Sequence, residues 1–204
     1  MRHLNRWSIQ ISGAMMLSGA LMLLVLPLQW VAAVFAAASW HELCHIFAVR
    51  LCGGSIHSMN VGDSGTIMEC RLMTPGREVI CVLAGPFGSL LLLTVVTWLP
   101  RTALCGCFHG LYNLIPIYPL DGGRALRTAS FTLLPRQRAE TLCTVIAYVV
   151  TVLFVILALV GTFVLNLGAF PLLLVTVLLF RMKREKLLAN CRNRGYNRPT
   201  IVKR

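Results

Sequence analysis

Charged residues are scarce in this 204-residue sequence, and acidic residues are the scarcest of them. Only 13% of the residues are charged, with 7 Asp and Glu against 19 Lys and Arg, while 57% are hydrophobic. A soluble domain of this length cannot bury so much apolar surface, so the composition predicts an integral membrane protein. The net charge of +12 then fits basic cytoplasmic loops beside anionic lipid headgroups. Because basic and aromatic residues do not interleave, we expect no nucleic-acid partner.

The sequence also lacks the pattern of a disulfide framework. Most of its eight cysteines lie in apolar or predicted cytoplasmic segments, where they are interpreted as packing residues or free thiols. Cys105 and Cys107 lie together near a predicted outer end, but one intervening residue is not the usual spacing of structural zinc ligands. They are interpreted as loop or helix-end cysteines rather than a redox pair. With no internal repeat or low-complexity linker, residues 1–204 are predicted to form a single domain.

Long apolar runs predict an all-α polytopic membrane protein with about six transmembrane helices. The spans are expected at residues 8–27, 29–51, 79–99, 103–119, 141–161 and 167–182. The first run follows Arg2 and Arg6 and resembles a signal peptide, but it is long and a second run follows at once. It is therefore interpreted as a retained first helix.

The distribution of basic residues predicts the orientation of these spans. With both termini inside, the cytoplasmic segments are residues 1–7, 50–78, 120–140 and 181–204, and only Arg101 of the 19 Lys and Arg residues lies outside. This bias favours cytoplasmic N- and C-termini, with a basic cytoplasmic tail at about residues 183–204.

The loop between spans two and three, about residues 53–78, predicts a short β-hairpin. Ser55–Val61 and Thr66–Leu72 read as two strands around a turn at Gly62–Gly65. Because open strand edges are not tolerated in lipid, the hairpin is expected in the membrane interface or along a wet cavity.

The most informative stretch is "ASWHELCHIFAVRL", residues 38–51, which contains H-E-x-x-H inside an apolar run. On a helix His41 and His45 share one face and can hold one metal ion, while Glu42 can reach a water held by that ion. Zinc lowers the pKa of such a water toward neutrality, and a carboxylate can then take its proton. Ionisable groups in a membrane span are costly and tend to mark function.

A catalytic zinc normally has three protein ligands, so a third must come from elsewhere in the chain. Asp121 is the best acidic candidate, in "NLIPIYPLDGGRAL" (residues 113–126). Pro116 and Pro119 interrupt the helix there, and Gly122 and Gly123 are expected to let the backbone turn tightly. Zinc ligation by Asp121 competes with a role as N-cap of a helix starting at Gly122.

Other polar residues each have a possible functional role and a possible structural role. The amide of Asn113 could donate to a developing oxyanion or substrate carbonyl, or make a hydrogen bond between helices. His57, in the hairpin, is either a substrate contact or an interfacial polar side chain, and Asn60 of the same loop is a further candidate. His109 precedes Asn113 by one helical turn and either faces the same cavity or makes an intramembrane hydrogen bond.

"HELCH" with a downstream "NLIPIYPLDGGR" resembles the site-2 protease family, membrane-embedded zinc metalloproteases of peptidase family M50. The resemblance is to the compact six-span bacterial branch of the sporulation type (stage IV sporulation protein FB-like). It covers residues 41–126, and the last two spans match only in hydropathy. From the sequence given, we expect neither that branch's C-terminal nucleotide-sensing domain nor the PDZ insertions of another branch.

The resemblance implies roles for individual residues. His41, His45 and Asp121 become ligands of one Zn²⁺ per chain, Glu42 the general base and later proton donor, and Asn113 a catalytic group that stabilises the intermediate. The family's "AGP" element appears at residues 84–86, and Ser89 stands where family members often have Asn, so Ser89 is a further candidate substrate contact. Cys44, where the family often has Gly, is expected to pack rather than bind metal.

The sequence thus predicts an intramembrane zinc endopeptidase that cleaves a single-span or membrane-tethered protein in or near its transmembrane segment. The resemblance implies a bacterial cell membrane, an active site toward the cytoplasmic side, and a membrane protein that regulates the enzyme. Two alternatives stay open: a metal-handling membrane protein that uses the same ligands, and a catalytically silent pseudoprotease that binds helices.

Overall fold

The computed structural model describes residues 8–11, 20, 22–62, 65–71, 74–166, 168–169, 171–180 and 182–183. The predicted basic tail at about 183–204 therefore lies almost wholly outside the described residues. The chain divides into two compact units, Met1–Thr144 and Val145–Arg204. All the candidate site residues belong to the first unit.

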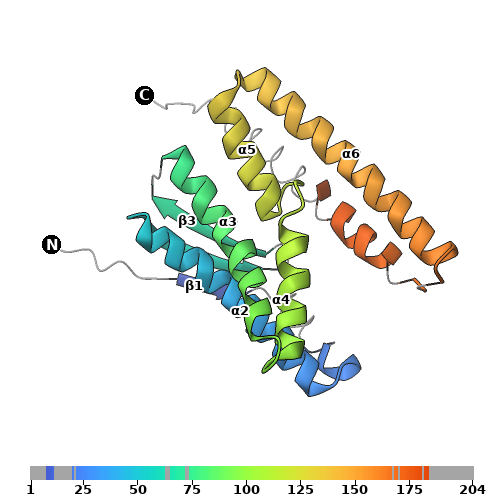
Figure 1. Ribbon diagram of the computed structural model, residues 1–204. Helices are drawn as coiled ribbons and strands as arrows, with labels where there is room; N and C mark the ends of the chain where they lie inside the picture. The colour runs from blue at the N-terminus through green and yellow to red at the C-terminus, as the bar shows by residue number, and fades with distance from the viewer. Residues whose placement is uncertain are drawn as a thin grey trace, which may run out of the picture. The chain divides into compact units, whose positions relative to one another are not determined.

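The described part of the first unit includes the helices α2 (Leu28–Leu51), α3 (Pro75–Leu91), α4 (Pro100–Asn113) and α5 (Asp121–Leu133). A 3-10 turn, η1 (Leu92–Val95), continues α3. Proline opens α3 and α4, where its missing N–H costs no hydrogen bond. Helices α2, α3 and α4 pack against one another, and α5 packs on α3 (Figure 1).

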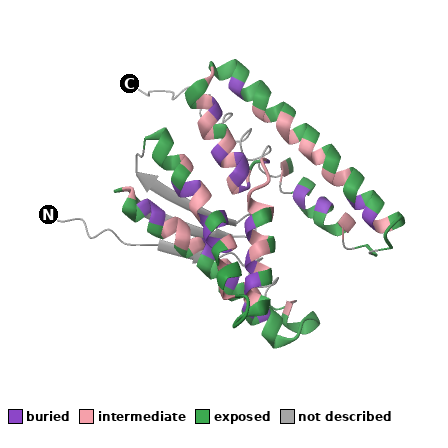
Figure 2. Ribbon diagram, viewed as in Figure 1, coloured by how far each residue is buried: buried purple, intermediate pink, exposed green. Residues whose placement is uncertain are grey.

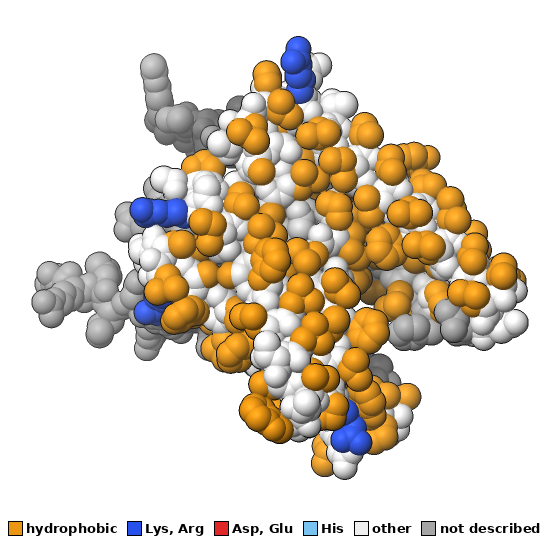
Figure 3. Space-filling model, in the orientation of Figure 1, with side chains coloured by type: hydrophobic (Ala, Val, Ile, Leu, Met, Phe, Trp, Pro, Cys, Tyr) orange, Lys and Arg blue, Asp and Glu red, His pale blue; other side chains and the backbone are white. Residues whose placement is uncertain are grey.

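Three helices among the described residues are long and apolar enough to cross a membrane: α2, Pro75–Val95, and α6 (Arg136–Phe163). They correspond to the expected spans two, three and five. Only 6% of the most apolar 18 residues of α6 is buried, so this helix exposes its apolar side chains along its length (Figure 2). Hydrophobic side chains also cover most of the face seen in Figure 3. Such a surface is what lipid, rather than water, solvates.

The fourth expected span, residues 103–119, is wrong as a continuous helix. Helix α4 ends at Asn113 and contains only 14 residues, and the chain from Leu114 to Leu120 is not helical. Pro116 and Pro119 explain the break, because proline removes backbone donors and clashes with the preceding helical turn. The Tyr118–Pro119 peptide bond is cis.

The break expected between the last two spans is present. Helix α6 ends at Phe163, Asn166 and Gly168 adopt positive φ angles of 52° and 68°, and a shorter apolar helix covers Pro171–Phe180. This part of the chain contributes no candidate site residue.

A three-stranded sheet follows the order β1 (Ser8–Ile11), β2 (Ser55–Gly62), β3 (Gly65–Arg71). Strands β2 and β3 pair antiparallel where the sequence predicts a hairpin, with an irregularity between Ile56 and Ser58. The odd residue there is His57. Strand β1 pairs parallel to β2, which makes β2 the central strand.

Strand β1 also corrects the first expected span, which cannot be helical from Ser8. The stretch Ser-Ile-Gln-Ile alternates polar and apolar residues, the period-two pattern of a strand, and in β1 it matches Ser58–Val61 of β2 residue by residue. Residues 12–19 and 21 lie outside the described part of the chain. Residues 22–25 are helical.

Candidate metal centre

Three side chains from two distant segments converge in the first unit. The Nε2 atom of His41 lies 3.1 Å from Oδ2 of Asp121, and Nε2 of His45 lies 3.2 Å from the same oxygen. The two Nε2 atoms are 3.2 Å apart. Within the part of the chain that the structure describes, these three residues form the one cluster of His, Cys, Asp and Glu suited to hold a metal ion.

Each histidine makes a second hydrogen bond through its other ring nitrogen. Nδ1 of His45 lies 2.8 Å from the carbonyl oxygen of Cys81, which can only accept, so Nδ1 carries the proton and Nε2 is left as a metal-binding lone pair in the neutral ring. Nδ1 of His41 lies 2.8 Å from the hydroxyl of Ser89. Both partners belong to α3, so this helix orients both imidazoles.

Glycines on α3 let α2 approach closely enough for these bonds. A Cβ atom added at Gly85 would overlap the ring of His45, and one added at Gly88 would overlap the side chain of Cys44. The indole N–H of Trp40 donates to the carbonyl of Gly88 at 2.8 Å and fastens the same contact. Cys44 packs here, outside the cluster of candidate ligands, as its expected packing role requires.

Asp121 is the first residue of α5, one position after the N-cap residue Leu120, and no side chain caps this helix. The N-cap alternative for Asp121 is therefore wrong, because its Oδ2 points to the two histidines instead. Gly122 and Gly123 do not make the tight turn expected of them. They are helical, and a Cβ at either would overlap the backbone of residues 114–118, so they allow α5 to pack tightly on the broken segment.

The carboxylate of Asp121 is only 13% exposed. Burial raises the pKa of Asp121, but its contacts with the imidazoles of His41 and His45 outweigh burial and hold the pKa below its usual value. Asp121 is therefore an anionic candidate ligand at neutral pH, in contact with two imidazoles.

The donor set fits zinc. Two imidazole nitrogens and one carboxylate oxygen, one atom from each residue, all lie within 4.8 Å of one another. Three protein ligands with a remaining position for water are the usual arrangement of a catalytic zinc site, and hydrogen-bonded Nδ1 atoms are its usual support.

The two expected catalytic residues come from α2 and from the end of α4. Glu42 follows His41 in α2 and is half-buried, and among the described residues its carboxylate makes no hydrogen bond or ion pair that would occupy it. Asn113, the last residue of α4, is half-buried and its Nδ2 donates to the carbonyl of His109 at 3.1 Å. In this arrangement the amide is held by its own helix.

The four expected substrate contacts have different settings. Ser89 is fully buried against His41, which leaves it no surface for a substrate. The ring of His109 lies edge-on to His41, with centroids 4.5 Å apart, so it does face the cluster. His57 and Asn60 belong to β2, whose backbone alone is described, so their roles stay predictions.

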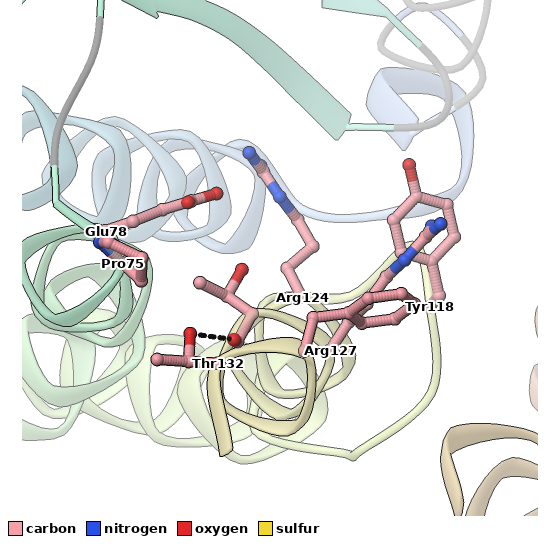
Figure 4. Close-up of a pocket in the computed structure, with 8 residues that line it drawn as sticks. Pro75, Glu78, Tyr118, Arg124, Arg127 and Thr132 are labelled. Atoms are coloured by element: carbon pink, nitrogen blue, oxygen red, sulfur yellow. Dashed lines mark hydrogen bonds between the residues drawn. The ribbon is translucent and has the colours of Figure 1, made fainter. Parts of the chain in front are cut away.

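Helix α5 also lines a pocket of about 430 Å³ that the sequence did not indicate. Side chains of Glu78 from α3 and Arg124 from α5 extend into it, and Arg127 lies 5.5 Å from the ring centroids of Tyr118 and Phe131 (Figure 4). Arg124 follows Asp121 by three residues, so the pocket begins about one helical turn from the metal cluster.

Residues 64–158 match the family model of peptidase family M50. The matched segment is just under half of the chain and contains Asn113 and Asp121, but not His41, Glu42 or His45. The geometry joins these two parts, since Asp121 from inside the segment meets both histidines from outside it.

Two curated relatives and one solved structure point the same way. The chain is 31% identical over 109 residues to a Mycobacterium tuberculosis protein assigned as the zinc metalloprotease Rip3, in strains H37Rv and Erdman. The match covers 43% of this chain and 27% of those relatives' length. The fold is similar to a site-2 protease from Methanocaldococcus jannaschii, with a TM-score of 0.62 at 18% identity over 91% of this chain and 93% of that one.

These findings support a relationship to peptidase family M50, the site-2 proteases, whose members are membrane zinc metalloproteases. None of the three matched proteins is named as a member of the sporulation-type branch, so that finer assignment stays a prediction.

Proposed function

We propose that this chain is an intramembrane zinc endopeptidase that hydrolyses a peptide bond in or near a transmembrane segment of a membrane-tethered protein. The observation that carries the proposal is that Asp121 meets His41 and His45 on α2, an apolar helix long enough to cross a bilayer, with Glu42 next to His41 in the same helix. A peptide bond buried in lipid can be hydrolysed only where an ion, a water and a base are brought to the same depth.

In the proposed mechanism His41, His45 and Asp121 would hold the zinc, and a bound zinc would supply a water of lowered pKa and a Lewis acid for the scissile carbonyl. Glu42 takes the proton of the attacking water and later delivers one to the leaving amine. Asn113 donates a hydrogen bond to the developing oxyanion, for which its amide must turn away from the His109 carbonyl.

The proposed setting is a bacterial cell membrane crossed about six times by residues 1–204 as one protease domain. Cytoplasmic termini and an active site toward the cytoplasm follow from the positive-inside bias of the sequence. The compact sporulation-type branch is our proposal within the family, because the two motifs and their order resemble it. A regulatory membrane protein is the further partner that this branch implies.

We also propose that an unwound substrate segment adds as a strand to the sheet, which would satisfy its backbone in the interface. Because β2 is paired on both sides, only the outer edges of β1 and β3 can take such a strand. Replacing residues 55–71 by a short flexible linker should then abolish cleavage while zinc remains bound. Cleavage that persists in this variant rules out strand addition.

The decisive experiment is co-expression with a panel of tagged single-span membrane proteins from the same organism. Wild type should release a shortened product, Glu42→Gln should release none, and both purified proteins should contain one zinc per chain. A wild type that binds zinc but cuts nothing in a proteome-wide search for truncated membrane proteins would favour the metal-handling alternative. A Glu42→Gln variant that cuts as well as wild type would contradict the proposed mechanism.

A further inference from the structure

Ser89 is placed unlike a substrate contact. It is 0% exposed, lies on α3, and its Oγ is 2.8 Å from Nδ1 of His41, which is itself only 2% exposed. Solvent therefore reaches neither the Ser89 hydroxyl nor Nδ1 of His41. The hydroxyl of Ser89 is therefore the partner that Nδ1 of His41 depends on.

Helix α4 closes the other side of Ser89 through two glycines. A Cβ atom added at Gly110 would lie 3.1 Å from Cβ of Ser89, and one added at Gly106 would lie 3.0 Å from its carbonyl oxygen. Three helices thus meet at this serine, with α2 supplying His41 and α4 supplying the glycines. A side chain without a hydroxyl at position 89 would leave Nδ1 of His41 without a hydrogen-bond partner in a dry contact.

The partners of the two histidines differ in what they can do. The Cys81 carbonyl only accepts, so it fixes one tautomer of neutral His45. A hydroxyl both donates and accepts. When Nε2 of His41 binds a metal, Nδ1–H can donate to Ser89; when Nε2–H instead donates to Asp121, the Ser89 hydroxyl can donate to Nδ1. The proton moves between two nitrogens of one neutral ring, and both ring nitrogens of His41 keep a partner in both arrangements.

We infer that Ser89 is a positioning residue that holds the His41 ring in place in both tautomers and thereby sets the metal affinity of the cluster. This inference rests on the proposed function only in that the cluster holds a metal. It assigns to Ser89 no contact with the substrate.

The test measures metal binding by the purified full chain, without a substrate. Zinc affinity is obtained by competition with a chromogenic chelator, and the ligand geometry from the visible absorption of the Co²⁺-loaded protein. Ser89→Ala should bind zinc about 10- to 100-fold more weakly, the usual loss when a partner of a metal-binding histidine is removed. Its Co²⁺ bands should shift, because the His41 ring is no longer oriented.

Ser130→Ala is the matched control, since Ser130 is also a buried serine, 5% exposed, on α5 away from the cluster. It should keep wild-type zinc affinity and Co²⁺ bands. Thermal unfolding of the metal-free proteins separates folding from positioning: Ser89→Ala should still unfold cooperatively, at a temperature only modestly below that of wild type, because Nδ1 of His41 has lost its partner.

Wild-type affinity in Ser89→Ala overturns the inference and leaves the proposed function intact. Weaker binding with unchanged Co²⁺ bands and a matching loss of metal-free stability also overturns it, because a general packing defect then accounts for the change. A wild type that binds neither zinc nor Co²⁺ overturns both the inference and the proposed function.

Discussion

Oδ2 of Asp121 lies 3.1 Å from Nε2 of His41, although 80 positions separate the two residues. The contact depends on the helix break before Asp121. Because α4 ends at Asn113 and α5 begins at Asp121, the first turn of α5 can face the middle of α2 rather than continue past it. Neither the H-E-x-x-H stretch nor the segment around Asp121 makes a three-ligand site alone.

Removing the Asp121 carboxylate should therefore remove the site while the fold persists. Asp121→Ala loses one of three candidate ligands and leaves two imidazoles. Removing the hydrogen-bond partner of a metal ligand lowers metal affinity by up to about 100-fold, so removing a ligand itself should lower zinc affinity by more than that. Zinc content after dialysis against a weak chelator measures it. Glu140→Gln is the control, because that carboxylate is 54% exposed and its ion-pair partner among the described residues is Arg136. Full zinc retention in Asp121→Ala would exclude Asp121 as a ligand.

The sequence predicted the three candidate ligands because both of their motifs are local. Helical spacing alone places His41 and His45 on one face, and the prolines before Asp121 predict a helix break. The partners of the ligands could not be predicted in this way. The Cys81 carbonyl and the Ser89 hydroxyl meet the histidines only through the packing of α3 on α2, which no local pattern encodes.

The errors in predicting the fold have equally local causes. Hydropathy alone extended the first span over Ser8–Ile11, although the alternation of polar and apolar residues there is typical of a strand. Gly122 and Gly123 were interpreted as turn residues, whereas their lack of a side chain serves the close approach of α5 to residues 114–118. A glycine pair does not by itself distinguish these two uses.

Gly85 on α3 should be as important to the metal cluster as a ligand. A methyl group there would overlap the His45 ring, which is held between the Cys81 carbonyl and Asp121 and cannot move without losing one of them. We expect Gly85→Ala to cost about 1–3 kcal/mol of stability, as overpacking does, and to lower zinc affinity. Thermal unfolding and chelator competition measure the two effects.

Gly76→Ala is the matched control for this change. Gly76 lies in the same helix, but nothing is within 4 Å of a Cβ placed there. Because alanine favours helix over glycine by about 0.8–1.0 kcal/mol, this variant should be as stable as wild type or more so, with unchanged zinc binding. Equal stability and equal zinc affinity of the two variants would contradict the close contact between Gly85 of α3 and the His45 ring.

Glu42→Gln should separate hydrolysis from metal binding. The substitution keeps the size of the side chain but removes the base, and general acid–base groups contribute about 10²–10⁴-fold to rate. Cleavage of the substrate found in the co-expression panel should fall by at least 100-fold on this scale, while zinc content stays at the wild-type level. Metal transport needs no base at this position, so Glu42→Gln should leave metal movement intact under the metal-handling alternative. Unchanged cleavage would remove Glu42 from the mechanism.

Asn113 offers the sharpest test of transition-state stabilisation, because its amide has a structural partner as well. If Asn113 donates to the oxyanion, Asn113→Ala should lower kcat by about 10²–10³-fold, the range for loss of one such donor, with little change in KM and full zinc content. If its role is instead the hydrogen bond to the His109 carbonyl, thermal stability should fall and kcat should not.

Thr132→Ala is the control, since Thr132 makes the same kind of bond to a carbonyl one turn earlier on an exposed part of α5. A loss of kcat in Asn113→Ala without a loss of stability beyond that of Thr132→Ala supports the catalytic role, and the reverse pattern contradicts it.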